Sequence, residues 1–368
     1  MKTSYLILMI LFVGKFIFAS ESYLYDSKIK PLIEVQKNGK GNKEASKAWL
    51  EVANLPVEKI PLLLTAMNQA NNLGDNWIRA AISKIAEKSE SAIPLKEIIR
   101  FLKDYKNEGD SRMEALNLIR DYDPEKANLL IPSFIDDPVS SLRREAVSVV
   151  ILDAQNQSSS QKKIKLYNYA LEKARDADQI TQISNTLKEE GININLVDLM
   201  GFSVNWKSIG PFDNTARQGF SKVYPPEKKI DFKKTYRGKT GSTSWSTLNQ
   251  HNEMGLIDIN LKYGEIKEAL VYAHTKFPSE TNQNVHFRIG SKNAWKLWVN
   301  GELIFARDEY HRGKTRIDQF VIKGKLNEGL NDILLKVCQN EQTQSWTKQW
   351  EFNFRITDTT GSPLRVEI

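Results

Sequence analysis

The chain has 368 residues, of which 40% are hydrophobic and 26% charged, and its formal net charge is +7. These proportions are those of a globular protein and exclude an intrinsically disordered chain, and the length allows two domains of ordinary size. Basic and acidic residues alternate along the chain without a polybasic run, so we expect no nucleic-acid partner.

The first twenty residues have the parts of a secretory signal peptide. Lys2 supplies the positive start, residues 5–13 are apolar, and small residues around the end of this stretch suit a signal peptidase. The apolar run is shorter than the ~20 residues that span a bilayer, and Lys15 interrupts it. We predict a signal peptide over residues 1–20 and export to the periplasm, the cell surface or the medium, with no transmembrane segment in the mature chain. The alternative is an uncleaved N-terminal anchor.

Cys338 is the only cysteine of the sequence. An exported protein with one thiol forms no internal disulfide, so its stability must come from buried apolar area. Cys338 lies in the apolar run DILLKVCQN, which predicts a half-buried strand residue and not a nucleophile.

Residues 28–200 carry apolar side chains at helical spacing, with few glycines and aromatics. Segments that start at Trp77, Ser111 and Leu142 align on alanines that are 34 and 31 residues apart. Each segment has an aspartate, then an arginine, then the alanine; the residues are Asp75, Arg79 and Ala81, Asp110, Arg112 and Ala115, and Asp137, Arg143 and Ala146. A period in the thirties with paired helices predicts an α-solenoid.

The Asp…Arg…Ala pattern, with prolines at Pro94 and Pro132, resembles HEAT-type repeats over roughly residues 40–190. In this interpretation the alanines let paired helices approach, and each arginine bonds the aspartate of its own or a neighbouring repeat. We therefore assign residues 21–200 to a HEAT-like α-solenoid and expect it to contact a protein partner. Gly191 is expected to cap the last long helix, and residues 192–200 to form a short helix or a connector.

After about Gly201 the apolar period falls to two, and aromatics, Gly and Thr become frequent. Asn300-Gly301 between two apolar runs predicts a β-hairpin turn. We expect strands at residues 206–209, 256–259, 268–277, 285–290, 294–299, 303–307, 316–322, 331–337 and 349–357. Many short strands separated by turns predict a β-sandwich or jelly roll.

The phrases WKSIGPFDN, FRIGSKNAWKLWVNGELIFAR and LNEGLNDILLKVCQN occur in that order. Together they resemble galactose-binding-like jelly rolls and the sugar-binding domain of family 2 glycoside hydrolases, over residues 203–368. The resemblance implies an antiparallel β-sandwich over residues 201–368, following the α-solenoid, and a carbohydrate ligand held by variable loops. Some members hold calcium, but Asp213 and Asn214 do not form a dense carboxylate set, so we expect neither a metal nor a cofactor.

Strand side chains alternate between two faces, which assigns Trp295, Leu297 and Val299 to the core. The opposite positions of three strands are basic or aromatic; they are Tyr272, His274, His286, Arg288, Lys296 and Trp298. If these strands are neighbours, the side chains form a face that suits a carbohydrate, because rings stack on sugars and basic groups donate to hydroxyls or carboxylates. Packing against the helices, or plain solvation, is the alternative. The loop residues His311 and Trp346 are further ligand-binding candidates, and Trp245 is expected in a polar loop.

The sequence contains no phosphate loop, no nucleophile elbow, no His-Glu-x-x-His helix and no zinc-type histidine spacing, so we expect no enzyme. The predicted function is that of an exported, non-catalytic binding protein, whose solenoid holds a protein and whose jelly roll holds a carbohydrate. Two alternatives stay open. One is an assembly scaffold without a small ligand, and the other is a cryptic glycoside hydrolase, whose two acids are remote in sequence.

Overall fold

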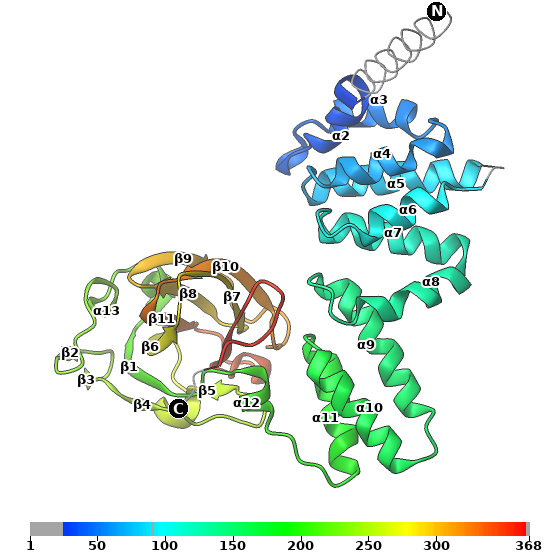
Figure 1. Cartoon of the computed structure of the whole chain (residues 1–368). Helices are drawn as coiled ribbons and strands as arrows, with labels where there is room; N and C mark the ends of the chain where they lie inside the picture. Colours follow the sequence, from blue (N-terminus) through cyan, green and yellow to red (C-terminus); the bar gives the residue numbers. More distant parts are fainter. Residues whose placement is uncertain (1–24, 90–91, 366–368) are drawn as a thin grey trace, which may run out of the picture. The chain divides into compact units, whose positions relative to one another are not determined.

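A computed structural model describes residues 25–89 and 92–365 (Figure 1). The predicted signal peptide, residues 1–20, lies outside the described residues. In the described part of the chain, no helix is long and apolar enough to cross a membrane. The chain divides into two compact units, Met1–Val149 and Val150–Ile368.

The first unit is helical (Figure 1). Its elements are η1 (Tyr25–Ile29), α2 (Lys30–Ile33), η2 (Lys37–Gly39), α3 (Asn42–Val52), η3 (Val57–Lys59), α4 (Ile60–Met67), α5 (Asn72–Lys88), α6 (Leu95–Lys103), α7 (Gly109–Tyr122), α8 (Pro124–Leu130), η4 (Ile131–Phe134) and the start of α9 (Ser140–Gln155). The aligned alanines Ala81, Ala115 and Ala146 lie on α5, α7 and α9 and are buried in one apolar core. A helical N-terminal part is thus confirmed, while its HEAT-like repetition stays a prediction.

A buried ion pair joins two successive segments of this unit. The Nη1 and Nη2 atoms of Arg112 donate to the two carboxylate oxygens of Asp137 at 2.9 and 2.6 Å, and both side chains are buried. Arg143 Nε donates to the main-chain oxygen of Asp137 at 2.8 Å. Arg79 instead pairs with Glu114, at 3.3 Å. The expected arginine–aspartate bond to a neighbouring segment is therefore present at Arg112 and is replaced by a glutamate partner at Arg79.

The second unit begins with helices and continues into strands. After the end of α9 come α10 (Ser160–Lys173), α11 (Ala177–Glu189) and α12 (Leu196–Met200). Gly191 has a left-handed φ of 84°, its N–H donates to Lys188 O, and the N–H of Ile192 donates to Leu187 O. This pair of bonds is the Schellman motif, which confirms the predicted cap.

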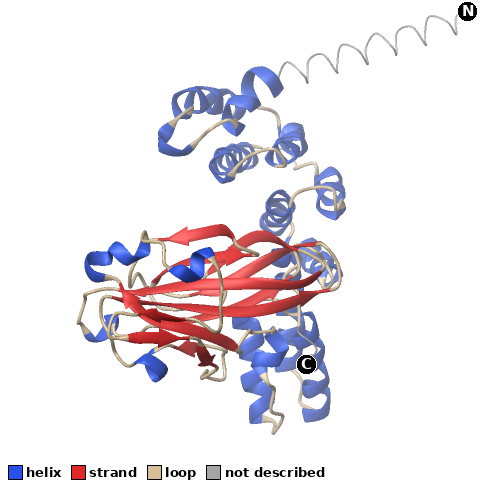
Figure 2. Ribbon diagram, turned by 90° about the vertical axis from the view of Figure 1, so that its left-hand side faces the viewer, coloured by secondary structure: helices blue, strands red, loops and turns tan. Residues whose placement is uncertain are grey.

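All the strand pairs of this unit are antiparallel, as predicted. The strands are β1 (Trp206–Asp213), β2 (Thr235–Arg237), β3 (Ser242–Ser244), β4 (Ser246–Leu248), β5 (Ile257–Asp258), β6 (Ala269–Ser279), β7 (Gln283–Gly290), β8 (Ala294–Val299), β9 (Glu302–Arg307), β10 (Phe320–Leu326), β11 (Gly329–Gln339) and β12 (Glu351–Thr357). One sheet has the order β4-β1-β6-β11-β8-β9, a second has the order β10-β7-β12-β5, and β2 pairs with β3 (Figure 2). Short helices η5 (Thr215–Phe220), α13 (Pro225–Lys228), α14 (Asn260–Tyr263) and η6 (Ser345–Thr347) lie in the connections.

The two larger sheets share one apolar core. Trp295 and Leu297 enter it from β8, while Phe287 and Phe354 enter it from the other sheet. The ring of Trp206 meets the ring of Phe352 edge-on at 5.3 Å. The predicted alternation of core residues along these strands is therefore confirmed.

Local backbone geometry explains where the observed strands agree with the expected ones and where they differ. Asn300 and Gly301 both have positive φ, 51° and 82°, as a tight hairpin between β8 and β9 requires, so that turn is confirmed. The strand expected at 316–322 begins only at Phe320, because Asp318 adopts a left-handed φ of 55°. The stretch around Trp245 was expected to be a loop, but it forms β3 and β4, which are short and polar and so lack the apolar alternation that predicts strands.

Candidate functional site

The six strand residues predicted to share one face lie on two different sheets. β6 and β8, which carry Tyr272 and Trp298, belong to the six-stranded sheet and are separated by β11. β7, which carries His286 and Arg288, belongs to the four-stranded sheet. Alternation along each strand was predicted correctly, but the order of strands depends on contacts between distant parts of the chain, and it divides the expected face.

The part of this face on the six-stranded sheet is covered by the chain itself. Tyr272 is fully buried and Trp298 is 6% exposed. Their rings pack with Phe220 and Tyr224, which belong to the segment 214–236 that contains η5 and α13. Residues of this covering segment close the outer surface of the sheet, so these two aromatic rings are structural.

A buried ion pair anchors the covering segment. Lys336 Nζ donates to Glu227 Oε1 at 2.9 Å and to the main-chain oxygens of Phe220 and Lys222 at 3.0 and 2.8 Å. The hydroxyl of Tyr272 donates to the same Glu227 oxygen. Burial lowers the pKa of Lys336 and raises the pKa of Tyr272. Lys296 completes this region, with its Nζ 4.6 Å from the centre of the Phe220 ring.

Three of the remaining candidates take part in internal bonds. Arg288 donates to Asp318 and to Thr357, both at 2.9 Å, and His286 is half-buried beside it on β7. His311 is buried, with Nε2 at 2.8 Å from Gln339 Oε1, and burial lowers its pKa. Trp346 on η6 is different, because its side chain is 55% exposed.

His274 leads to an open site that includes no other predicted residue. Its Nε2 lies 2.8 Å from Asp332 Oδ1, and burial lowers its pKa. Its ring packs against Phe232 at 5.2 Å, and Trp245 supports the same phenylalanine at 5.3 Å. Phe232 itself is 38% exposed, so its ring is fixed from below by two aromatic neighbours and open on its outer side.

Phe232 lines a cavity of about 450 Å³ on the six-stranded sheet, which we call the Phe232 pocket. The Nζ atom of Lys207 lies 5.1 Å from the centre of the Phe232 ring. Side chains that can donate hydrogen bonds surround the ring; they are Asn205, Lys207, Thr247 and Lys276. In the described residues of the strand-rich part, Phe232 and Trp346 are the aromatic side chains that remain exposed.

The sequence contained a signal for Phe232 that the strand pattern did not use. Phe232 stands as a lone aromatic residue in the charged run EKKIDFKK. A large apolar side chain in such a run is either buried by a distant partner or exposed for contact. The alternation argument weighed only residues on predicted strands, and Phe232 lies between α13 and β2.

No family model matches this chain, and no curated protein matches it. Among solved structures, a beta-glucosidase from Kluyveromyces marxianus is 12% identical over 42% of this chain and 14% of its own, with a TM-score of 0.24. The PA14 domain of the MpAFP antifreeze protein is 10% identical over 45% of this chain and 86% of its own, with a TM-score of 0.26. The Epithelial Adhesin 9 A domain from Candida glabrata, solved with Galb1-4GlcNAc, is 12% identical over 42% of this chain and 81% of its own, with a TM-score of 0.20.

The chain thus spans about one seventh of the length of the glucosidase that it matches. TM-scores of this size carry no argument about this chain, and the function proposed below rests on the site alone.

Proposed function

We propose that this protein is a non-catalytic carbohydrate-binding protein and that its sugar site is the Phe232 pocket. The observation that carries the proposal is the exposed Phe232 ring, held by His274 and Trp245 within a cavity whose rim donates hydrogen bonds. A concave site with an apolar floor and a few polar groups is the usual form of a small-ligand site.

The chemistry of the pocket fits a sugar ring. The C–H face of a pyranose stacks on an aromatic ring, and burial of both surfaces is favourable. The ammonium groups of Lys207 and Lys276 are then placed to donate to hydroxyl or carboxylate oxygens at the edge of the sugar. His274, fixed by Asp332, acts as a positioning residue, because it holds the Phe232 ring in place.

A glycan array probed with the full chain tests this proposal. We expect binding to at least one glycan, and we expect the Phe232→Ala variant to lose it while the Leu330→Ala variant keeps it. Leu330 is a matched control because it is an exposed apolar residue of the same region, on β11. Loss of binding in Trp346→Ala but not in Phe232→Ala would move the site to Trp346, and cleavage of a bound glycan would contradict the non-catalytic role.

An assembly scaffold without a small ligand is the second candidate function, and one observation favours it. Tyr272 and Trp298, the aromatic residues expected to meet a ligand, are buried under the covering segment. On this hypothesis the sheet surface is closed for stability and the helices carry the function. Failure of every glycan to bind, together with capture of a protein by the helical unit, would favour it.

The finer features of the architecture belong to the same proposal. We propose that the helical part is a HEAT-like solenoid that binds a protein, and that the strands form a jelly-roll β-sandwich in a domain starting near residue 201. The solenoid's partner would meet exposed apolar side chains of the first unit, such as Leu50 and Leu129, which are 61% and 76% exposed. We also propose export, on the basis of the signal-like residues 1–20, and sequencing of the mature N-terminus tests it.

A further inference from the structure

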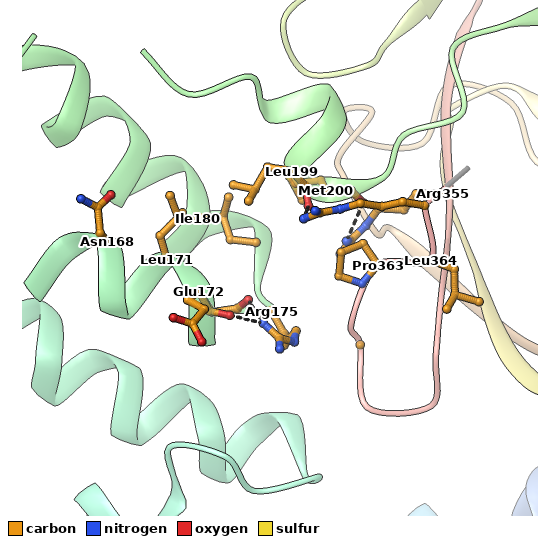
Figure 3. Close-up of a pocket in the computed structure, with 13 residues that line it drawn as sticks. Asn168, Leu171, Glu172, Arg175, Ile180, Leu199, Met200, Arg355, Pro363 and Leu364 are labelled. Atoms are coloured by element: carbon orange, nitrogen blue, oxygen red, sulfur yellow. Dashed lines mark hydrogen bonds between the residues drawn. The ribbon is translucent and has the colours of Figure 1, made fainter. Parts of the chain in front are cut away.

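A second cavity of the Val150–Ile368 unit has a different chemistry (Figure 3). It has a volume of about 650 Å³ and is lined by residues of α10, α11, α12, β12 and the segment that follows β12. Its charged lining consists of Arg175, Arg355, Arg365 and Glu172. We call it the arginine cavity, because arginines outnumber acids in its wall.

The buried charges beside this cavity do not balance. Arg355 is 1% exposed, and its Nε and Nη2 atoms donate to the two carboxylate oxygens of Asp318. Arg288 Nη1 donates to the same carboxylate at 2.9 Å. Two guanidinium groups therefore share one carboxylate, and one positive charge of this cluster is left over.

The acid in the cavity wall does not offset this charge. The carboxylate of Glu172 lies 3.6 Å from Lys173 Nζ, and its side chain is 72% exposed. Other guanidinium bonds go to neutral groups. Arg355 Nη1 donates to Met200 O at 3.2 Å, and Arg365 Nη2 donates to Leu199 O at 3.1 Å. Main-chain oxygens position these arginines without neutralising them.

The wall of the cavity is built by specific backbone geometry. Asp318 holds its carboxylate between two arginines from a left-handed φ of 55°, which is costly for a residue with a side chain. The turn after β12 is fixed by Asp358, whose Oδ1 accepts from the N–H groups of Thr360 and Ser362. Arg175 Nε donates to Ser362 Oγ at 2.9 Å, which links this turn to the end of α10.

We propose that the arginine cavity binds the oxyanion group, a carboxylate or a phosphate, of a small organic ligand. Guanidinium forks match the geometry of both groups, and bonds between ionised partners are the strong ones in partly buried sites. The volume is that of a small-molecule site. The inference is independent of the Phe232 pocket, which shares no lining residue with this cavity.

Isothermal titration calorimetry on the full chain at low ionic strength tests this inference. The probes are inorganic phosphate, citrate and D-glucuronate, with neutral D-glucose as the reference. We expect at least one oxyanion probe to saturate a single site and to bind more weakly as salt is added. A preference for phosphate identifies a phosphorylated ligand, and a preference for citrate or glucuronate identifies a carboxylate; each result supports the proposal.

Three variants locate the binding. Arg365→Gln removes an exposed charge and one guanidinium fork, and we expect it to weaken the oxyanion by about tenfold. Leu199→Glu places a competing carboxylate in the cavity, and we expect it to abolish binding. Arg237→Gln is the matched control, because Arg237 is an exposed arginine on β2 that does not line the cavity, and its binding should equal that of the wild type.

The proposal is overturned if no oxyanion probe saturates the folded protein, or if Arg365→Gln binds the best probe as tightly as the wild type. Arg365 is exposed, so its replacement leaves a folded protein even if Leu199→Glu does not fold. Phe232→Ala separates the two sites. It should keep oxyanion binding whether or not the carbohydrate proposal holds, and loss of oxyanion binding in this variant would assign the oxyanion to the Phe232 pocket.

Discussion

At the scale of single residues, the Lys336–Glu227 pair carries the largest local consequence. Lys336 is fully buried on a sheet surface, and its charge is matched only by a glutamate of the covering segment among the described residues. Removing one partner of such a pair leaves an uncompensated buried charge, whereas replacing both removes that penalty.

Glu227→Ala should therefore lower the free energy of unfolding by about 3 to 5 kcal/mol. Urea denaturation followed by circular dichroism measures this loss. The double variant Glu227→Ala with Lys336→Met is the control and should recover part of it, because no charge is then buried alone. A loss below about 1 kcal/mol in the single variant would show that water reaches Lys336.

Buried histidines make stability depend on pH in a defined direction. Burial holds the pKa values of His274, His286 and His311 below the ordinary value of 6.5. As the pH falls below 6.5, the unfolded chain takes up protons at these sites before the folded chain does, so stability is lost. The contribution is fully present above pH 6.5.

We expect the stability advantage of the wild type over His274→Gln to shrink between pH 7.5 and pH 5.5, because the variant lacks this titration. Urea denaturation at both pH values measures the difference. An advantage that stays constant, or that grows as the pH falls, would mean that His274 is as easily protonated in the folded state as in the unfolded state.

At the scale of elements, Gly191 ends α11 in a left-handed conformation, and no atom lies within 4 Å of a Cβ placed there. The cost of a side chain at this position is therefore conformational and not steric. Gly191→Ala should destabilise the protein by about 1 kcal/mol, and Gly191→Asn should cost less, because asparagine tolerates this region. Thermal or urea unfolding of both variants checks the order, and an equal cost would contradict the cap.

The elements also show what the sequence could predict. The bounds of β8 agree with the expected residues 294–299, and Gly191 and Asn300-Gly301 were identified, because these features depend on local spacing and backbone preference. The single basic face was wrong, since it required β7 to lie beside β6, and strand order is set by the whole fold. Phe232 was missed for a related reason, because its partners His274 and Trp245 come from other elements.

At the scale of the whole molecule, the helices α10, α11 and α12 belong to the same compact unit as the strands. Arg355 and Arg365 donate to main-chain oxygens of α12, and Arg175 donates to Ser362. A fragment of residues 150–368 should therefore have a higher urea midpoint than a fragment of residues 201–368, which lacks these bonds. Equal midpoints would support a boundary near residue 201 instead.

The affinity of Phe232→Ala for the best glycan, measured by isothermal titration calorimetry beside the wild type and Leu330→Ala, tests the central claim most directly. Loss of stacking should cost about 1.4 kcal/mol, so we expect about tenfold weaker binding in Phe232→Ala and unchanged binding in Leu330→Ala. Equal affinities of the wild type and Phe232→Ala for a glycan that binds would contradict the assignment of the sugar site to the Phe232 pocket.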